Sequence, residues 1–383
     1  MARKITGISR ELIIHPGETL GDILEDRGIT QAELAARTGV SPAYVCNVIS
    51  GKKDISANFA FALEYALGIP KSFWINLQAN YDAELLEVTA QDTITEEERA
   101  ARSRLKDVVK YLRETGKMAP GETKNDSILS LRKALGISNV SNLKSIVPGG
   151  ALKLSAEFKG DPYVMGAWLR LCEIAGEQRT IKAGFDAEKV NELVNAAKKV
   201  MLDQGDSVQE SLAGLFENYG INFSVVRDFR GAPVHGYIAK KKDGTFQLVM
   251  TVKDEFADIF WFMLFRELGH IVNGDVTGGS DFIDFADSAD NEYGLNESGV
   301  NKSGSDEYGG NDSAAVAFSD SMLIEPAAYA RFVGNADFGL DAIKEFAASQ
   351  GVPPFIVIGR LQRDKLIDRD CYSSEKVRYK WAD

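Results

Sequence analysis

The residue types that could do chemistry lie in one apolar stretch, Phe260–Ile271, which contains Arg266, Glu267 and His270. Zinc-dependent peptide hydrolysis on a helix uses the pattern His-Glu-x-x-His, in which two imidazoles bind the metal and the Glu acts on its water. Here the Glu and the second His are present, but Arg266 stands at the position of the first His. A guanidinium stays protonated and has no lone pair, so it cannot bind zinc. The pattern predicts a broken metal site.

The elements around this stretch are predicted from hydrophobic periodicity. Three short runs rich in β-branched and aromatic residues, separated by glycine-containing turns, predict strands over 221–226, 234–239 and 246–252. A helix over 258–273 follows them and carries the broken pattern. His235, within the second strand, is an alternative metal ligand, but a lone His in a strand is more often structural.

Near the N-terminus, residues 16–67 form a run of short predicted helices. Thr30 is typical of a helix N-cap, Gly39 of a helix end, and Ser41 of the next N-cap, with that helix running to Ile49. Two helices joined by a tight turn with Gly predict a helix-turn-helix. The alternative is a small helical packing module that does not contact DNA.

In a helix-turn-helix, the first residues of the second helix meet base edges in the major groove. Asn can read adenine, Gln at the start of the preceding helix can contact phosphate, and lysines add positive charge. The predicted DNA-binding residues are Gln31, Ser41, Ala43, Tyr44, Asn47, Lys52 and Lys53. Because one module with so few cations should bind weakly alone, we expect a homodimer on a two-fold operator.

Four motifs carry a family resemblance at this end of the chain. They are 16–20 (Pro-Gly-Glu-Thr-Leu), 30–35 (Thr-Gln-Ala-Glu-Leu-Ala), 49–52 (Ile-Ser-Gly-Lys) and 73–82, which reads Phe-Trp-Ile-Asn-Leu-Gln-Ala-Asn-Tyr-Asp. Over residues 10–82 the chain resembles the HigA antitoxin branch of XRE-type regulators. The resemblance implies binding to operator DNA and to a protein toxin encoded nearby.

A second resemblance starts from the block 258–271. It is similar to the ImmA/IrrE metallopeptidase family, in which an aromatic run leads into His-Glu-Leu-Gly-His and an acidic ligand follows in a downstream helix. The matching downstream segment is 312–319, where Asp312 falls on the ligand position and is shortened by one methylene. Val316 and Glu325 depart from the family pattern. Residues 353–363 resemble a segment of HigA-linked members of this family and predict a helical cap.

Of the three implied ligand positions, Arg266, His270 and Asp312, only His270 is unchanged. Since catalytic zinc needs three protein ligands and an open position, we expect no zinc, no other cofactor and a pseudo-enzyme in which Glu267 is a vestigial catalytic residue. The hypothesis is that Arg266 takes the place of the metal and pairs with Asp312. The alternative is an active metallopeptidase that recruits other ligands, such as His235 or an acid from the following loop.

Length and composition limit the architecture. The chain has 383 residues, 44% hydrophobic and 26% charged, which is typical of a globular protein. The net charge of -12 confines any DNA contact to one module. Cys46, Cys172 and Cys371 match neither a disulfide framework nor a zinc cluster. Without a signal-peptide core or a membrane-length apolar run, we expect a cytoplasmic protein that does not contact a membrane.

We therefore predict an α+β protein that is mostly helical, with three regions. Residues 1–82 form an all-α helix-turn-helix domain, and 83–126 a charged helical linker that either transmits a signal or is simply solvated. Residues 127–383 form a zincin-like domain: helices over 127–219, the sheet and broken helix over 220–275, a mobile acidic loop over 277–310 and helices over 311–383. The acidic loop could mimic nucleic acid or dock a basic toxin, but a solvated insertion is the simpler interpretation.

The predicted function is a DNA-binding antitoxin and transcriptional autorepressor of a toxin-antitoxin operon. Its metal-free C-terminal domain would bind the toxin or a ligand. The alternatives are an active regulatory metallopeptidase that cleaves a repressor and a prophage repressor without a toxin partner. The Arg at position 266 favours the first interpretation.

Overall fold

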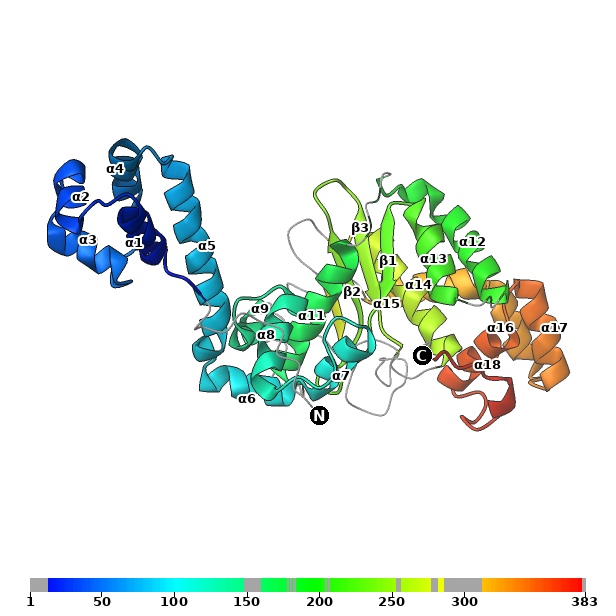
Figure 1. Ribbon diagram of the computed structural model, residues 1–383. Helices are drawn as coiled ribbons and strands as arrows, with labels where there is room; N and C mark the ends of the chain where they lie inside the picture. Colours follow the sequence, from blue (N-terminus) through cyan, green and yellow to red (C-terminus); the bar gives the residue numbers. More distant parts are fainter. Residues whose placement is uncertain are drawn as a thin grey trace. The chain divides into compact units, whose positions relative to one another are not determined.

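The computed structural model describes residues 13–147, 160–177, 179, 181, 184–203, 205, 207–252, 256–276, 282–285 and 312–380. The chain divides into two compact units (Figure 1). The N-terminal unit comprises residues 1–96 and 123–129, and the C-terminal unit comprises residues 97–122 and 130–383. Each unit has its own hydrophobic core and is described by itself.

The N-terminal unit is all-helical, as predicted. Its elements are α1 (Pro16–Asp26), α2 (Gln31–Thr38), α3 (Pro42–Ile49), α4 (Ala57–Leu67), α5 (Lys71–Thr89) and η2 (Ala90–Thr93). The helix-start residues act as expected: Oγ1 of Thr30 accepts a hydrogen bond from the Glu33 amide at 3.1 Å, and Oγ of Ser41 accepts one from the Tyr44 amide at 3.2 Å. Gly39 ends α2 at a φ of 71°, which favours glycine.

Residues 83–126 form the end of α5, η2 and the next helices. These helices are α6 (Glu96–Arg104), α7 (Lys106–Glu114) and the start of α8 (Lys124–Leu135). The simple picture of a solvated helix does not hold for Glu98, which is fully buried within the C-terminal unit. Its carboxylate accepts hydrogen bonds from Arg132 Nη2 at 2.6 Å and from the Val140 amide at 2.9 Å. A buried charge needs such partners, so Glu98 attaches α6 to the C-terminal unit.

The remaining elements belong to the C-terminal unit. They are η3 (Val140–Asn142), α9 (Leu143–Ile146), α11 (Pro162–Glu177), η5 (Ala187–Lys189), α12 (Val190–Asp203), α13 (Val208–Glu217), β1 (Ile221–Val225), β2 (Val234–Lys240), β3 (Phe246–Met250), α14 (Ala257–Asn273), β4 (Phe282–Phe285), α15 (Asp312–Leu323), α16 (Pro326–Asn335), α17 (Leu340–Gln350), α18 (Pro354–Arg363) and η6 (Ser373–Glu375).

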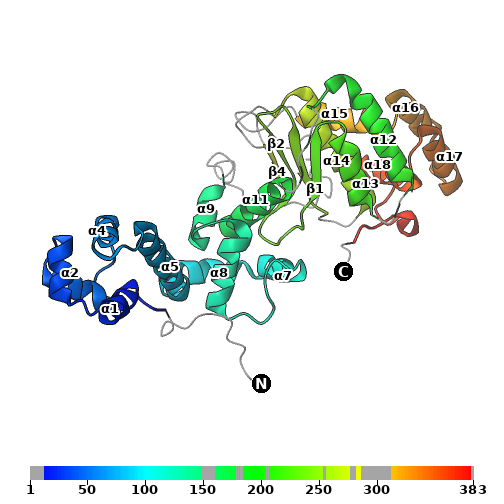
Figure 2. The same ribbon diagram turned by 45° about the horizontal axis from the view of Figure 1, so that its top comes forward.

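The sheet has four strands in the order β1-β3-β2-β4 (Figures 1 and 2). β1 and β3 are parallel, whereas β2 is antiparallel to both β3 and β4. The three predicted strands are present, so the mostly helical fold with a small sheet is confirmed. β4 corrects the prediction of a loop over 277–310, because 282–285 pair with β2; the rest of that loop lies outside the described residues.

Helices cover both faces of this sheet. On one face, the Tyr237 ring makes an edge contact with Trp168 of α11 at 6.5 Å, and Gln247 donates a hydrogen bond to the Cys172 carbonyl of the same helix. On the other face, Ile238 and Leu248 enter the hydrophobic core that α12, α13 and α14 share. Side chains that alternate along a strand thus meet different helices.

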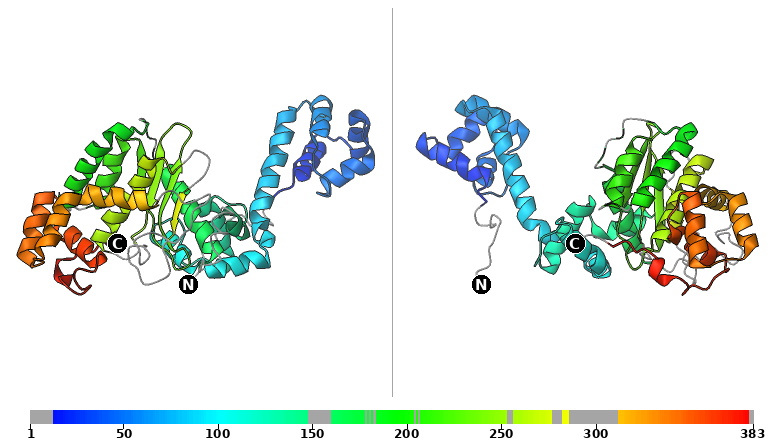
Figure 3. Two further views of the ribbon diagram at one scale, coloured as in Figure 1. Left: turned by 180° about the vertical axis from the view of Figure 1, so that it is seen from behind. Right: turned by 90° about the vertical axis from the view of Figure 1, so that its right-hand side faces the viewer.

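The C-terminal helices complete the unit. α16 and α17 pack through stacked rings of Phe332 and Phe346, whose centroids are 4.3 Å apart, and α18 lies beside them (Figure 3). α18 corresponds to the predicted helical cap. It also packs on α14, where Asp258 lies so close to Gly359 that a side chain at position 359 would not fit. No helix within the described part of the chain is long and apolar enough to cross a membrane.

Candidate functional site

The helix with the broken pattern, α14, is buried from Ala257 to Ile271. Two glycines allow neighbouring elements to approach it. A Cβ on Gly236 of β2 would lie 3.0 Å from Cδ of Glu267, and a Cβ on Gly269 would lie 3.0 Å from Cα of Ala315 on α15. Gly269 of the Glu-Leu-Gly-His pattern is therefore needed for the close packing of α15 on α14. The neighbouring side chains of Arg266, Glu267 and His270 are buried in the interior.

Arg266 forms a buried ion pair that the sequence did not reveal. Its Nη1 lies 2.5 Å from Oδ2 of Asp284 on β4, and the two side chains are 2% and 3% exposed. The same nitrogen lies 3.8 Å from Oε1 of Glu267. The hypothesis named Asp312 as the partner of Arg266. Asp312 begins α15, but its side chain lies outside the described part, so that pairing stays a prediction and Asp284 is the partner observed.

The protonation of Asp284 follows from its surroundings. Burial acts to raise the pKa of Asp284, but the positive charge of Arg266, the influence of His235 and hydrogen bonds from Glu267 and Arg266 outweigh it and lower that pKa. Asp284 is therefore the ionised partner of Arg266. Glu267 is fully buried beside this pair.

His270 is buried, with a carboxylate beside its ring. It is 1% exposed, and its Nδ1 lies 2.8 Å from Oδ2 of Asp275. Burial and the charge of Arg266 lower the pKa of His270, against the opposing effect of Asp275. A neutral ring that donates its Nδ1 proton to Asp275 carries its lone pair on Nε2, as in zinc sites with a carboxylate behind the His.

The residues present do not fit a zinc ion held by this pattern. Arg266 adds a fixed positive charge, which would repel a cation next to His270. Arg266 also pairs with Asp284, so this carboxylate is not available as a metal ligand. Within the described part of the chain, no group of three His, Cys, Asp or Glu side chains is placed to hold a metal. His235, the alternative ligand, is buried on β2.

Sequence reasoning missed two members of this cluster, Asp275 and Asp284. Asp275 directly follows Gly274, which ends α14. The Asp275 amide donates a hydrogen bond to the His270 carbonyl at 3.1 Å, and this turn brings the Asp275 carboxylate next to the His270 ring. Asp284 lies in the stretch predicted to be an acidic loop. The run Phe-Ile-Asp-Phe over 282–285 was the available signal, because apolar neighbours on both sides of a single acid favour a strand.

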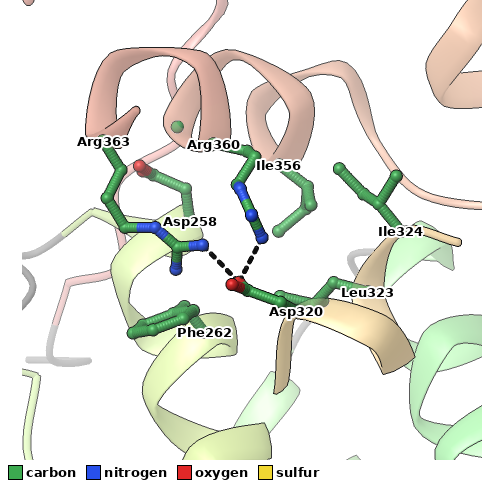
Figure 4. Close-up of a pocket in the computed structure, with 9 residues that line it drawn as sticks. Asp258, Phe262, Asp320, Leu323, Ile324, Ile356, Arg360 and Arg363 are labelled. Atoms are coloured by element: carbon green, nitrogen blue, oxygen red, sulfur yellow. Dashed lines mark hydrogen bonds and ion pairs between the residues drawn. The ribbon is translucent and has the colours of Figure 1, made fainter. Parts of the chain in front are cut away.

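A second charged cluster lies between α14, α15 and α18 (Figure 4). Arg360 and Arg363 both point at the carboxylate of Asp320. Nη1 of Arg360 lies 2.5 Å from Oδ1 of Asp320. Arg363 also lies over the Phe262 ring, 4.2 Å from its centroid. Nearby, Lys376 lies 3.6 Å from Asp258. The contacts of Arg360 and Arg363 join α18 to α15 and α14.

In the N-terminal unit, α3 presents its predicted residues on the outer side. Val45 and Val48 are buried in the core, whereas Ser41 and Ala43 are exposed and Tyr44 and Asn47 partly exposed. Gln31, Lys52 and Lys53 are exposed as well. The seven predicted DNA-binding residues thus lie on α3, at its two ends and at the start of α2, and their role in binding DNA stays a prediction.

The motif over 73–82 has a structural explanation that the sequence did not provide. Trp74 is fully buried in the core of the unit. Gln78 accepts a hydrogen bond from the Ile55 amide at 2.9 Å and donates one to Asp82 at 2.8 Å, so α5 holds the segment that follows α3. The Tyr81 ring meets His15 at 4.7 Å. These contacts hold α5 against the segment after α3 and against the start of α1.

A tight contact also fixes α1 against α3. Nδ1 of His15 accepts a hydrogen bond from the Gly17 amide at 2.9 Å and so caps α1. A Cβ on Gly17 would lie 1.8 Å from the carbonyl oxygen of Val48. The Pro-Gly pair at the start of α1 is therefore required by packing.

Comparison with known proteins agrees with this geometry. Residues 20–74 match the helix-turn-helix family HTH_3. The N-terminal unit is a helix-turn-helix domain. A curated relative, virulence-associated protein A' of Dichelobacter nodosus, is 38% identical over 69 residues, which are 18% of this chain and 60% of that protein. The chain thus spans less than two thirds of the length of this relative.

Two solved structures are similar to the helix-turn-helix domain. One is an addiction module antidote protein of a HigA family from Coxiella burnetii, 28% identical over 21% of this chain and 95% of that one, with a TM-score of 0.20. The other is the antitoxin HigA of Pseudomonas aeruginosa with the higBA promoter, 31% identical over 22% of this chain and 96% of that one, also with a TM-score of 0.20. At these TM-scores the assignment depends on the family match and on the geometry of α1–α5.

Proposed function

We propose that the protein is a DNA-binding antitoxin and transcriptional autorepressor of a toxin-antitoxin operon. The observation that carries the proposal is the outward side of α3, where Ser41, Ala43, Tyr44 and Asn47 are accessible while Val45 and Val48 hold the helix in the core. In a helix-turn-helix this side enters the major groove. Lys52 and Lys53 follow α3 directly and would neutralise phosphates.

The cationic side chains of this surface are not fixed by strong partners. Lys53 lies over the Tyr44 ring, 4.9 Å from its centroid, and Arg37 pairs with Glu33 in an exposed i,i+4 contact. Exposed pairs of this kind contribute about 0–1 kcal/mol, so a phosphate can replace them. We further propose that two copies bind a two-fold operator, because one copy supplies few phosphate contacts.

The test is an electrophoretic shift of the full chain with DNA from its own promoter region at low salt. We expect a specific complex whose affinity falls steeply as salt is raised, because counterions are released on binding. Absence of a complex at low salt would contradict the proposal. A complex whose affinity is equal for the promoter and for unrelated DNA would contradict autorepression.

For the C-terminal unit, we propose an ImmA/IrrE-like pseudo-metallopeptidase domain that binds a toxin or another partner in its former substrate cleft. The supporting observation is the buried pair of Arg266 with Asp284, because Arg266 stands at the sequence position of the first metal-binding His in the family pattern. Co-expression with the product of the neighbouring gene tests the toxin partner. Recovery of the two proteins as one complex is expected, and independent elution would contradict it.

A second candidate function is an active metallopeptidase. One observation favours it: His270 is oriented through Nδ1 by Asp275, as metal-binding His residues are. Incubating the zinc-treated protein with candidate repressors tests this candidate. Cleavage that a chelator abolishes would support it, whereas an intact repressor supports the pseudo-enzyme.

A further inference from the structure

The strand β4 occupies one edge of the sheet and pairs with a single neighbour, β2. In this pairing Asp284 lies opposite Gly236 and Phe282 opposite Ile238, and the register shifts between Val234 and Gly236. β4 comprises Phe282–Phe285, and within the described part of the chain it pairs with β2 alone. Contacts of its side chains add to the backbone hydrogen bonds that hold it in place.

Two side chains of β4 hold it against α14. The carboxylate of Asp284 meets the Arg266 guanidinium at 2.5 Å. The Phe282 ring lies 4.5 Å from the His270 ring, with the planes inclined by 39°. Since alternate residues of a strand share a face, Phe282 and Asp284 point to the same side of the sheet, toward His270 and Arg266 of α14.

The hydrogen-bond pattern shows which groups of β2 face β4. The Thr251 amide donates to the His235 carbonyl at 2.9 Å, and the Lys241 amide donates to the Thr245 carbonyl at 2.8 Å. In an antiparallel ladder every second residue bonds the same neighbour, so Tyr237 and Ala239 bond β3, whereas Gly236 and Ile238 present their amides and carbonyls to β4. Without β4 these groups would form an open strand edge.

We propose that this edge of β2 is a docking groove for an extended segment of a partner protein, and that β4 is the chain's own occupant, which the partner segment displaces. Backbone hydrogen bonds to Gly236 and Ile238 would supply affinity, as in other cases of strand addition. The partner segment carries an aromatic residue and, two positions later, an acidic residue, matching Phe282 and Asp284.

The acidic residue matters because Asp284 is the near partner of Arg266, at 2.5 Å, whereas Glu267 lies 3.8 Å from the same nitrogen. A guanidinium stays charged, and at 2% exposure it needs a carboxylate partner. A segment that replaces β4 must therefore bring its own carboxylate to the same register. This inference deepens the partner-binding role proposed for the C-terminal unit and does not depend on DNA binding.

Hydrogen exchange of the wild-type full chain provides the first test. If β4 detaches while the rest of the sheet stays folded, the amides of Gly236 and Ile238 exchange about tenfold or more faster than those of Tyr237 and Ala239. Equal protection of the two sets would mean that β4 opens only with the whole sheet, and it would overturn the proposal.

Peptide binding provides the second test, with the nine-residue segment 280–288 as the probe. The full-length variant Asp284→Asn weakens β4, and we expect it to bind this peptide about tenfold more tightly than the wild type does. A peptide with Asn in place of its Asp at 284 should bind the variant about tenfold more weakly. The control variant Asp368→Asn, at an exposed aspartate, should bind like the wild type.

Three results would contradict the proposal. In the first, the peptide does not bind to a folded Asp284→Asn variant. In the second, the peptide binds equally to this variant and to the wild type. In the third, the peptides with Asp and with Asn bind equally to the variant. If the variant does not fold, the exchange measurement on the wild type still decides. Since promoter binding and recovery with the neighbouring gene product are measured separately, failure here is distinguishable from failure of the proposed function.

Discussion

Arg266 and Asp284 meet in the interior of the C-terminal unit, with Nη1 and Oδ2 2.5 Å apart. The first residue belongs to a helix that resembles a zinc-binding helix, and the second belongs to an edge strand. In the pseudo-metallopeptidase domain that we propose, this cation and the carboxylate that neutralises it would replace the attraction that a metal would give to this region.

The variant Arg266→Ala should strongly destabilise the C-terminal unit. It leaves the Asp284 carboxylate buried beside Glu267, and removing one partner of a buried pair costs about 3–5 kcal/mol. The double variant Arg266→Leu with Asp284→Leu should recover most of this loss, because no buried charge is left alone. Urea unfolding measures both. In the matched exposed pair, Lys344→Ala should change the free energy of unfolding by less than about 1 kcal/mol.

Acid should destabilise the folded protein in two stages. The pKa of His270 is lowered from its ordinary value of 6.5, so below that value the unfolded state binds a proton that the folded state does not, and stability falls. The pKa of Asp284 is also lowered, so its contribution is present above its ordinary value of 3.8 and is lost as the pH falls through its folded pKa. Urea unfolding from pH 8 down to a pH well below 3.8 should show a lower free energy of unfolding at each stage. A flat profile, or an unchanged first stage in His270→Gln, would contradict this account.

Two variants of the helix-turn-helix domain should separate base recognition from phosphate contact. Asn47→Ala should lose about 1–3 kcal/mol of discrimination at one operator position, because a bidentate contact to adenine is removed. Lys52→Ala should weaken binding to all sequences and reduce the salt dependence by about one phosphate contact. Lys71→Ala, on α5, is the control and should leave both quantities unchanged. If Asn47→Ala bound every sequence as the wild type does, α3 would not be the reading helix.

Restoring the missing imidazole should restore metal binding. In Arg266→His two imidazoles lie four apart on α14 and the fixed cation is gone, so we expect the purified variant to take up about one zinc ion per chain. Arg266→Gln removes the same charge without supplying a ligand, and it should take up none. Equal zinc uptake by the two variants, or none by either, would show that position 266 is not what prevents metal binding.

Local patterns predicted much of this structure. The caps Thr30 and Ser41 fixed the limits of α2 and α3, and alternating residues located β1, β2 and β3. The sequence could not identify the pairing of Asp284 with Arg266, because the two residues are 18 apart and the stretch around Asp284 has a composition that favours a loop. Nor could it assign Gln78, whose partner Ile55 lies 23 residues away. Helix caps act within one turn, whereas these contacts depend on the folded arrangement.

The metal content of the wild-type protein tests the central claim most directly. The full chain would be equilibrated with excess zinc, dialysed and analysed for zinc by elemental analysis. We predict far less than one zinc ion per chain, because Arg266 holds a positive charge beside His270 and engages Asp284. A value close to one zinc ion per chain, lost in His270→Gln, would contradict the account.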